Sequence, residues 1–382
     1  MDKNLKFFDD IERLRGFACI LVLVQHLVWI CPYTFVIRTL PSWLFVGYGA
    51  VRIFFAISGF VITLSLMNKF GKGDDPFIDK ISAAKDWLLT FYKKRFFRIF
   101  PVVFAVLIIF GVFLLLTFKD LSWISPLLRA PFEIFFGTFN NMVELHWGNV
   151  SVNEAFDKVY GSGIGPLWTL AIDSLFYMIW PIVLLALQNN SQRAMVSLGL
   201  GLLFACIVSP LNYSYLGYHY YWTVNNIAEL FFGAFLAFVY AKTGVSNKKC
   251  NKFIPAIAAL GVWIYPSLTY TYYLFCENII TTFLCVSVVA ICVFFEGSFD
   301  FPLLGKAFKF LGKRSYSFYA IQLTLASIVV WFTDSIYFPK EWFSDSQTSF
   351  YTWQFVIFIV LLFAVTEVLF RLVEVPFRKL GR

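Results

Sequence analysis

Residues 44–67 read LFVGYGAVRIFFAISGFVITLSLM, and Arg52 is the single charged side chain among them. A helix needs about 20 mostly apolar residues to cross the hydrocarbon core of a bilayer, so this stretch is long enough to span a membrane. Working outward from it, about ten such segments can be marked along the chain: 14–35, 44–67, 99–118, 167–187, 195–213, 222–240, 254–273, 279–295, 316–332 and 351–373.

The composition of the whole chain agrees with this pattern. Its 382 residues are 59% hydrophobic and 14% charged, whereas soluble domains are roughly 45–50% apolar and about 25% charged. A water-soluble globule is therefore excluded. We predict an all-α, polytopic helix bundle of about ten transmembrane helices, forming one domain over residues 1–382 with no appended soluble domain. The N-terminal MDKNLKFFDD does not look like a cleavable signal peptide, so the first helix is expected to direct its own insertion.

The basic residues indicate how the chain is oriented. The chain has 31 Lys and Arg against 23 Asp and Glu, a net charge of +8. With the N-terminus placed inside the cell, 25 of the 31 basic residues fall in inside loops and five in outside loops. This obeys the positive-inside rule, so both termini are predicted to be cytoplasmic. The basic charge then faces membrane lipids, and nucleic acid loses its support as a partner.

Two connecting segments are notable for their length. The cytoplasmic segment 68–98 is basic, and the outer segment 119–165 is the longest on its side. The middle of the outer segment, APFEIFFGTFNNM, is apolar enough to lie in the interface or to re-enter the membrane.

The cysteines do not suggest a metal or disulfide site. They are odd in number, contain no CxxC pair and lie mostly in apolar runs, as small core residues do. The seven are Cys19, Cys31, Cys206, Cys250, Cys276, Cys285 and Cys292.

Ionisable groups inside spanning segments cost about 2.5–3.5 kcal/mol each, so each one requires an explanation. They are His26, Arg52, Asp173, Glu229 and Glu367.

Of these groups, His26 is the best candidate for a functional residue. It follows Arg15 by eleven residues, close to three helical turns and a rise of about 16 Å, so both side chains point the same way. A neutral imidazole there can act as a base or a nucleophile. The alternative is a histidine bonded to a neighbouring helix.

The string DWLLTFYKKRFFRIFP, which ends segment 68–98, interleaves basic and aromatic residues. If it is helical, Arg95 and Arg98 share one face and can clamp phosphates, while the aromatic rings can stack a base. The alternative is an anchor for anionic lipid headgroups. Glu374, at the inner end of the last segment, can pair with these arginines or with Arg15, or form an ordinary interfacial ion pair. Next to Ser58, Gly59 allows close approach of a backbone or a ligand, although small residues in membrane helices more often serve packing.

Six strings occur together in an order and spacing that resembles the integral-membrane acyltransferase family 3. They are IERLRG with His26, RIFFAISGF, KKRFFRIFP, WTLAIDSLFYMIWP, LGKRSYSFYAIQ and VEVPF, and the match covers nearly the whole chain. Members of this family are bacterial membrane proteins that acylate carbohydrates, mostly by O-acetylation of surface polysaccharides, lipopolysaccharide or peptidoglycan.

The resemblance implies a donor, an acceptor and a place in the cell. The donor is acetyl-CoA from the cytoplasm, and no metal is expected. The acceptor is a hydroxyl of a cell-surface carbohydrate, such as O-antigen, capsule, another polysaccharide or a lipid-linked glycan. The protein is then a multi-pass protein of the bacterial inner membrane.

The resemblance also implies roles for particular residues. His26, Arg15 and Glu374 correspond to catalytic residues, and Arg95 and Arg98 to an Arg-x-x-Arg that contacts the cofactor's phosphates. We assign Lys94 and Ser58 to cofactor binding as well. The residues that we assign to the acceptor are Trp168, Asp173, Glu229 and Arg52.

The chain departs from the family pattern at three places. The paired acids that usually follow the tryptophan of the fourth segment appear as Asp173 and Ser174. Asn226 stands where an arginine is common, and Gln322 stands where many members have a second histidine. These changes argue against proton transfer by Gln322 or Ser174 and indicate a different acceptor.

Two other classes of protein, a transporter and an inactive scaffold, share some of these features. A proton-coupled secondary transporter would also have about ten helices and buried acids, but we find no internal repeat and no matched pair of broken helices. A catalytically inactive scaffold is disfavoured because both the Arg15 and His26 pair and the Arg95 and Arg98 pair are intact.

Overall fold

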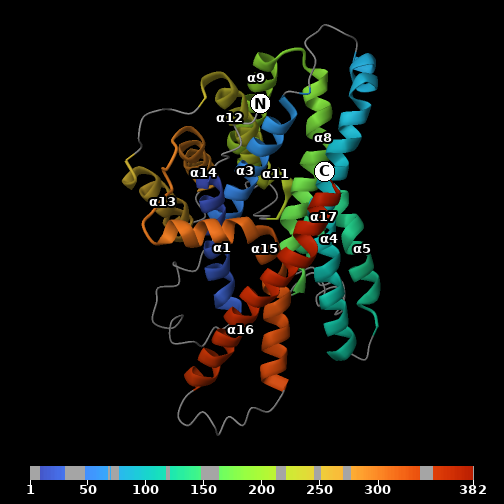
Figure 1. The fold of residues 1–382 in the computed structure, drawn as a ribbon, viewed down its shortest axis with the longest axis vertical. Coiled ribbons are helices and arrows are strands. Elements are labelled where there is room, and N and C mark those ends of the chain that lie inside the picture. The colour runs from blue at the N-terminus through green and yellow to red at the C-terminus, as the bar shows by residue number, and fades with distance from the viewer. Residues whose placement is uncertain are drawn as a thin grey trace.

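The computed structural model of the chain describes residues 9–30, 48–67, 69, 77–117, 121–147, 163–211, 221–244, 251–269, 277–335 and 347–381. These residues are almost entirely helical and contain no extended strand, which confirms the predicted all-α class (Figure 1). The main helices are α1 (Asp9–Ile30), α3 (Tyr48–Met67), α4 (Phe77–Thr117), α5 (Ile124–Phe135), α6 (Phe139–Trp147), α8 (Trp168–Ala186), α9 (Asn190–Leu203), α11 (Thr223–Asn226), α12 (Ala228–Thr243), α13 (Phe253–Thr269), α14 (Glu277–Phe294), α15 (Leu304–Ser335), α16 (Gln347–Leu369) and α17 (Val375–Leu380). A short 3-10 turn, η3 (Gly165–Leu167), precedes α8, and the π-helical turns η4 (Phe204–Val208) and η6 (Phe370–Glu374) follow α9 and α16.

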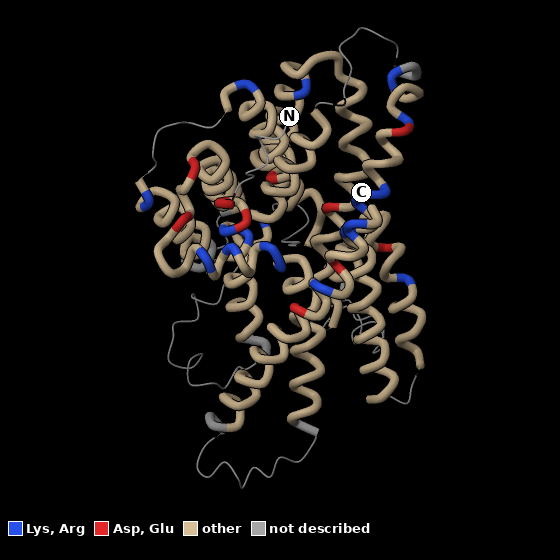
Figure 2. The backbone as a smooth tube through the Cα atoms, in the orientation of Figure 1, with Lys and Arg blue, Asp and Glu red and all other residues tan. Residues whose placement is uncertain are grey.

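Among the described residues, seven helical stretches are long and apolar enough to cross a membrane. Two shorter apolar helices, Phe253–Tyr265 and Asn278–Phe294, and the helix α1 coincide with the remaining predicted segments. The polytopic architecture is therefore confirmed, while the number of crossings and the cytoplasmic location of the termini stay predictions. Charged residues lie mostly in the upper and middle parts of the molecule in Figure 2, and the lower ends of α4, α15 and α16 carry almost none.

Paired glycines bring α1 and α15 into close contact. A Cβ on Gly16 would lie 1.9 Å from the carbonyl oxygen of Phe308, and a Cβ on Gly312 would lie 1.7 Å from the carbonyl oxygen of Glu12. Helices approach this closely only where a glycine faces the neighbouring backbone. The side chains that follow on both helices are therefore held in fixed register.

The helices α3 and α12 cross in the same manner. A Cβ on Gly59 would lie 1.9 Å from the carbonyl oxygen of Leu230, and a Cβ on Gly233 would lie 2.0 Å from that of Ala56. Gly59 therefore serves helix packing and not ligand approach. The neighbouring Ser58 does not share this contact and lines the cavity described below.

The outer segment 119–165 contains a helical hairpin in its described part. The helix α5 runs along α4, from the level of Gly111, which faces Leu127, to that of Phe100, whose ring centroid lies 5.8 Å from that of Phe135. The turn to α6 passes through Gly137, whose φ of +72° is strained for other residues. Twelve residues rise only about 18 Å, less than the roughly 30 Å of the hydrocarbon core, so α5 cannot span it. This geometry favours the re-entrant alternative.

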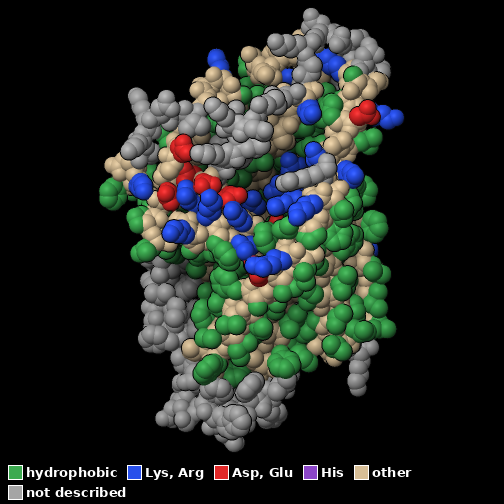
Figure 3. Space-filling model, in the orientation of Figure 1, with side chains coloured by type: hydrophobic (Ala, Val, Ile, Leu, Met, Phe, Trp, Pro, Cys, Tyr) green, Lys and Arg blue, Asp and Glu red, His purple; other side chains and the backbone are tan. Residues whose placement is uncertain are grey.

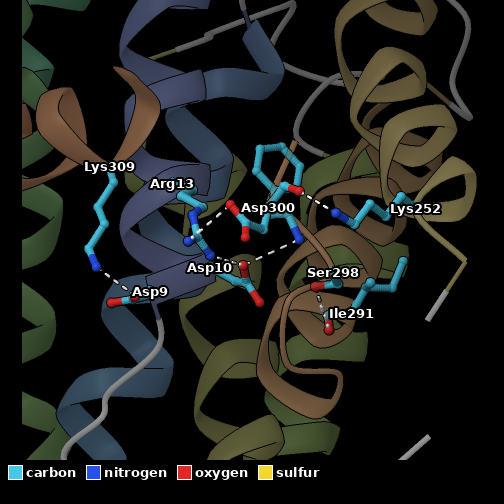
Figure 4. Close-up of polar contacts among 9 residues, drawn as sticks. Asp9, Asp10, Arg13, Lys252, Ile291, Ser298, Asp300 and Lys309 are labelled. Atoms are coloured by element: carbon cyan, nitrogen blue, oxygen red, sulfur yellow. Dashed lines mark hydrogen bonds and ion pairs between the residues drawn. The ribbon is translucent and has the colours of Figure 1, made fainter. Parts of the chain in front are cut away.

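A polar network joins the start of α1 to the turn before α15 (Figure 4). Arg13 contacts Asp10 at 2.7 Å and Asp300 at 3.1 Å. Lys309 of α15 lies 2.6 Å from Asp9, and this hydrogen bond lowers the pKa of the Asp9 carboxyl. The network fixes the first turn of α1 against α15, next to the glycine crossing.

Candidate functional site

A cavity of about 250 Å³ lies where α1, α3, α4, α8 and α15 meet. It is smaller than the roughly 300–1,000 Å³ of typical ligand sites, so it suits one part of an elongated ligand. Polar and aromatic side chains from all five helices line it. They are Glu12, Arg15, Ser58, Arg95, Arg98, Thr169, Asp173, Ser315, Tyr177, Tyr316, Tyr319, Phe54 and Phe55.

Three guanidinium groups face this one cavity. Arg15 comes from α1, and Arg95 and Arg98 come from α4. Residues 77–98 of the predicted basic segment are the first part of a single 41-residue helix, so Arg95 and Arg98 do share a face. Within the described residues, none of the three forms an ion pair with a carboxylate at 4.0 Å or less, whereas Arg13, Arg52 and Arg314 all do. Unpaired guanidinium groups around an enclosed space favour an anionic ligand.

The Arg95 guanidinium is held in place by aromatic rings. Its central carbon lies 5.3 Å from the centroids of both Phe91 and Tyr177. Cation–π contacts of this kind orient the group without neutralising its charge. Arg95 therefore remains available to an anion in the cavity.

Asp173 and Ser58 line the same cavity as the arginines, although the sequence assigned them to different ligands. The Ser58 hydroxyl donates a hydrogen bond to Asp173 Oδ2 at 3.3 Å. Among the described residues, Asp173 Oδ1 is buried without a hydrogen-bond partner. The structure thus brings a predicted acceptor residue and a predicted cofactor residue into one cavity.

Sequence reasoning missed three tyrosines in this cavity, Tyr177, Tyr316 and Tyr319. The Tyr316 hydroxyl donates to the carbonyl oxygen of Ile99 at 2.5 Å, and the Tyr319 hydroxyl donates to that of Pro166 at 2.8 Å. The sequence did contain a sign of this grouping. Tyr177 lies four residues after Asp173, and Tyr316 and Tyr319 are three residues apart, so that they share one helix face. The hydroxyls of Tyr316 and Tyr319 thus connect α15 to α4 and to η3, the turn before α8.

His26 lies on α1 beyond the cavity and is half-buried. Its Nδ1 is 3.0 Å from Oε1 of Gln322, a fully buried residue on α15. Gln322 follows Tyr319, which lines the cavity, by three residues, a rise of about 4.5 Å. The sequence did not indicate which residue contacts His26; among the described residues, that contact is Gln322.

Glu374 and Lys94 lie outside the cavity lining. Glu374 is buried at the π-helical turn η6, where it accepts a hydrogen bond from Ser317 at 2.6 Å and lies 3.9 Å from Arg378. The ion pair that Glu374 forms is therefore the ordinary one, with Arg378 four residues further on. Within 4.0 Å it forms no ion pair with Arg15, Arg95 or Arg98 among the described residues. Lys94 is exposed.

Trp168, predicted to contact the acceptor, is buried between aromatic rings. Its ring centroid lies 6.0 Å from that of Phe55 and 5.2 Å from that of Tyr221. It supports the cavity wall, because Phe55 and the adjacent Thr169 line the cavity.

Arg52 and Glu229 form a separate buried pair that joins α3, α12 and α14. The nearest nitrogen and oxygen of the pair are 3.4 Å apart, and both residues are at most 3% exposed. Thr282 donates to Glu229 at 2.6 Å, and Arg52 donates to the side chain of Asn278 at 2.6 Å. Neither member of the pair lines the cavity. Glu367, without an assigned role, pairs with Arg314 and Arg371.

The described residues contain no group of three or more His, Cys, Asp or Glu side chains that could hold a metal ion. The described residues offer a cavity lined by three arginines and, beyond it, an imidazole that contacts an amide.

These features define a polytopic helical protein with an arginine-lined cavity, and comparison with known proteins gives its family. A family model described as an acyltransferase domain matches residues 8–371. The chain therefore belongs to acyltransferase family 3, as its motifs indicated.

Two relatives from Staphylococcus aureus (strain COL) illustrate the match. A protein named "Putative O-acetyltransferase" is 26% identical over 408 residues, which cover 99% of this chain and 58% of that protein. The O-acetyltransferase OatA is 24% identical over 396 residues, which cover 98% of this chain and 58% of OatA. The chain thus spans less than two thirds of the length of these relatives. No solved structure matches it.

Proposed function

We propose that this protein is an O-acyltransferase that moves an acetyl group from cytoplasmic acetyl-CoA to a hydroxyl of a cell-surface carbohydrate. The observation that carries the proposal is the set of three unpaired arginines around one cavity, with a hydrogen-bonded histidine further along the same helix as Arg15. The names of the relatives support acetyl as the transferred group and oxygen as the accepting atom.

In this proposal, the phosphates of the cofactor bind Arg95, Arg98 and Arg15. Guanidinium groups bind phosphates with two parallel hydrogen bonds. The extended arm of the cofactor then passes Tyr319 and presents its thioester to His26, about 16 Å beyond Arg15 along α1. The arginines and Tyr319 line the cavity, and His26 lies beyond it.

Two routes of transfer are open to His26. In direct transfer, its ring takes the proton of the acceptor hydroxyl while that oxygen attacks the thioester carbonyl, and the carbon–sulfur bond breaks to release the thiol. In the covalent route, a ring nitrogen attacks the thioester carbonyl, and the carbon–sulfur bond breaks to release the thiol, which leaves with the ring's proton. The acceptor oxygen then attacks the carbonyl of the acetyl-imidazole, the carbon–nitrogen bond breaks, and the hydroxyl proton returns to the ring. Trapping labelled acetyl on the protein without an acceptor would identify the covalent route.

The acceptor and location that we propose follow the family. The acceptor is a polysaccharide, lipopolysaccharide or lipid-linked glycan, and the protein lies in the bacterial inner membrane with its cofactor side toward the cytoplasm. The basic residues support this orientation, because most of them belong to the loops on the side of the arginine cavity.

The arginine cavity gives the first test. Replacing Arg95 and Arg98 with Ala should weaken CoA binding by about 100-fold or more, because each lost charge-assisted hydrogen bond contributes about 1.5–3 kcal/mol. Binding is measured by calorimetry and by the thermal stabilisation that CoA gives to the purified protein.

The matched control replaces Lys85 and Lys93 with Ala. Both are exposed on the same helix, so the net charge changes equally while the cavity is intact. Equal loss of affinity in both double variants would contradict a specific phosphate site. No CoA binding by the wild-type protein would return the transporter to consideration.

A further inference from the structure

The contact between His26 and Gln322 joins α1 and α15, two helices that also contact each other at other places along their length. Cys19 Sγ lies 3.7 Å from the carbonyl oxygen of Ser315, and His26 Nδ1 lies 3.0 Å from Gln322 Oε1. Both pairs are separated by 296 residues in sequence, so α1 and α15 keep one register over two turns. Because the glycine crossing fixes this register, the position of Gln322 beside the ring is set by the fold.

The chemistry of the amide decides what this contact does. An amide oxygen can only accept a hydrogen bond, and a neutral imidazole carries one proton. A proton on Nδ1 therefore satisfies the contact, and the lone pair on Nε2 is left free.

Resting on the function proposed above, we propose that Gln322 is the positioning residue of His26. Its amide oxygen holds the ring proton on Nδ1, so that Nε2 faces the reactants as the base or nucleophile. Either route of acetyl transfer requires this tautomer if Nε2 is the reacting atom.

Packing alone does not account for a glutamine at this position. Gln322 is fully buried, and its Nε2 has no hydrogen-bond partner in the part of the chain that the structure describes. Buried polar groups that serve only structure are normally satisfied at both ends. A leucine would fill the same space without leaving an amide nitrogen unsatisfied, so the bond to His26 is what the glutamine adds.

A glutamine at position 322 also differs from an Asp or Glu at the same position. A carboxylate would form an ion pair with the protonated ring and favour that form. A neutral amide orients the ring without this effect. The chain therefore has an orienting group that does not itself accept or release a proton, which agrees with the earlier expectation that Gln322 takes no part in proton transfer.

The first test is spectroscopic and does not need activity. The sequence contains two other histidines, His146 and His219. With both replaced by Asn, ¹⁵N labelling of histidine reports on His26 alone, and the shifts of its two ring nitrogens show which one is protonated. We expect Nδ1 protonated and Nε2 bare at neutral pH. A proton on Nε2 in the full-length protein would overturn the proposal, whatever its activity.

The second test uses variants of Gln322. Gln322→Leu should give a mixture of tautomers and lower kcat by at least about tenfold, with KM for acetyl-CoA within about twofold of the wild-type value. Gln322→Glu retains an acceptor oxygen for Nδ1 but also favours the doubly protonated ring, so most of kcat should return only at pH values high enough to leave Nε2 without a proton. Equal kcat in Gln322→Leu and wild type would overturn the proposal.

Gln354→Leu is the matched control. Gln354 is also buried, but it lies on α16 and donates to Thr333 at 2.7 Å. Its replacement should leave the His26 tautomer and kcat unchanged even if it lowers thermal stability. A loss of kcat equal to that of Gln322→Leu would mean that general destabilisation explains both, against the proposal.

Failure of the proposed function would look different. If the ring has the expected tautomer and Gln322→Leu disturbs it, but His26→Ala still transfers acetyl groups, then Gln322 does orient the ring and the ring is not the catalyst. That result overturns the catalytic role of His26 and, with it, the role of Gln322 in the reaction.

Discussion

Arg15 and His26 lie on one helix and have different surroundings. Arg15 lines the cavity with two other unpaired arginines, whereas His26 lies beyond the cavity and is bonded to Gln322. The cavity arginine and the imidazole are thus separated by about three turns of α1, and in the proposed function the first binds the cofactor and the second takes part in the transfer. Ligand binding and chemistry should therefore respond to different substitutions.

Replacing His26 with Ala tests this separation. Because His26 does not line the cavity, CoA affinity should stay within about twofold, while acetyl transfer should fall by about 100-fold or more, the usual contribution of a general base or nucleophile. Calorimetry measures the affinity, and transfer of labelled acetyl to the acceptor measures the rate. Loss of both together would indicate that His26 supports the cavity.

At the scale of single elements, the bundle depends on glycine crossings. Gly59 and Gly233 let α3 and α12 touch, and the residue beside Gly59 is Ser58, which lines the cavity. The close approach of these helices therefore positions one wall of the site.

Two Gly→Ala substitutions should have opposite effects. At Gly59 the new Cβ would lie 1.9 Å from the carbonyl oxygen of Leu230, so α3 and α12 must separate and the midpoint of thermal unfolding should fall sharply. At Gly199 no atom lies within 4 Å of the new Cβ, so Ala should stabilise α9 by about 0.5–1 kcal/mol. Differential scanning fluorimetry of both variants checks this, and equal midpoints would contradict the crossing.

The pair formed by Arg52 and Glu229 joins three helices and is buried among them. Its members are 3% and 0% exposed. The sequence assigned both residues to the acceptor, and their position in the helix interface points to a structural role as well.

Removing one partner of this pair should cost about 3–5 kcal/mol, because the other charge is left buried. Arg52→Met should therefore lower the unfolding midpoint strongly, and adding Glu229→Gln should restore much of it, because the amide still accepts from Thr282. Thermal unfolding of the single and double variants measures this. Full stability of Arg52→Met together with loss of acceptor affinity would instead support the acceptor assignment.

At the scale of the whole molecule, charge and apolar surface are separated. Basic side chains form a band across the face shown in Figure 3, and an apolar surface lies below it. A membrane would cover that apolar surface, since lipid tails and not water can face it.

Cysteine labelling tests this orientation. In a cysteine-free background, Lys379→Cys in α17 should react with a membrane-impermeant maleimide only after the cells are permeabilised. Ser122→Cys, just before α5, should react in intact cells, because it belongs to the predicted outer segment. The reverse pattern would place the termini outside and would remove cytoplasmic acetyl-CoA as the donor.

The sequence by itself determined the class, the approximate spans and the residues worth testing. Long apolar runs leave no soluble alternative, and the spacing of Arg95 from Arg98 predicts a shared face because a helix repeats every 3.6 residues. Both signals are local, so a single chain suffices to detect them.

Only the tertiary structure decided which distant residues meet. The contact of His26 with Gln322, the placement of Tyr319 in the cavity and the partner of Glu229 all depend on how helices cross. These crossings are set by backbone approach at glycines such as Gly16 and Gly312, and apolar sequence with many small residues does not specify which glycines face each other. Periodicity fixes the direction of a side chain on its own helix, whereas packing between helices fixes its partner.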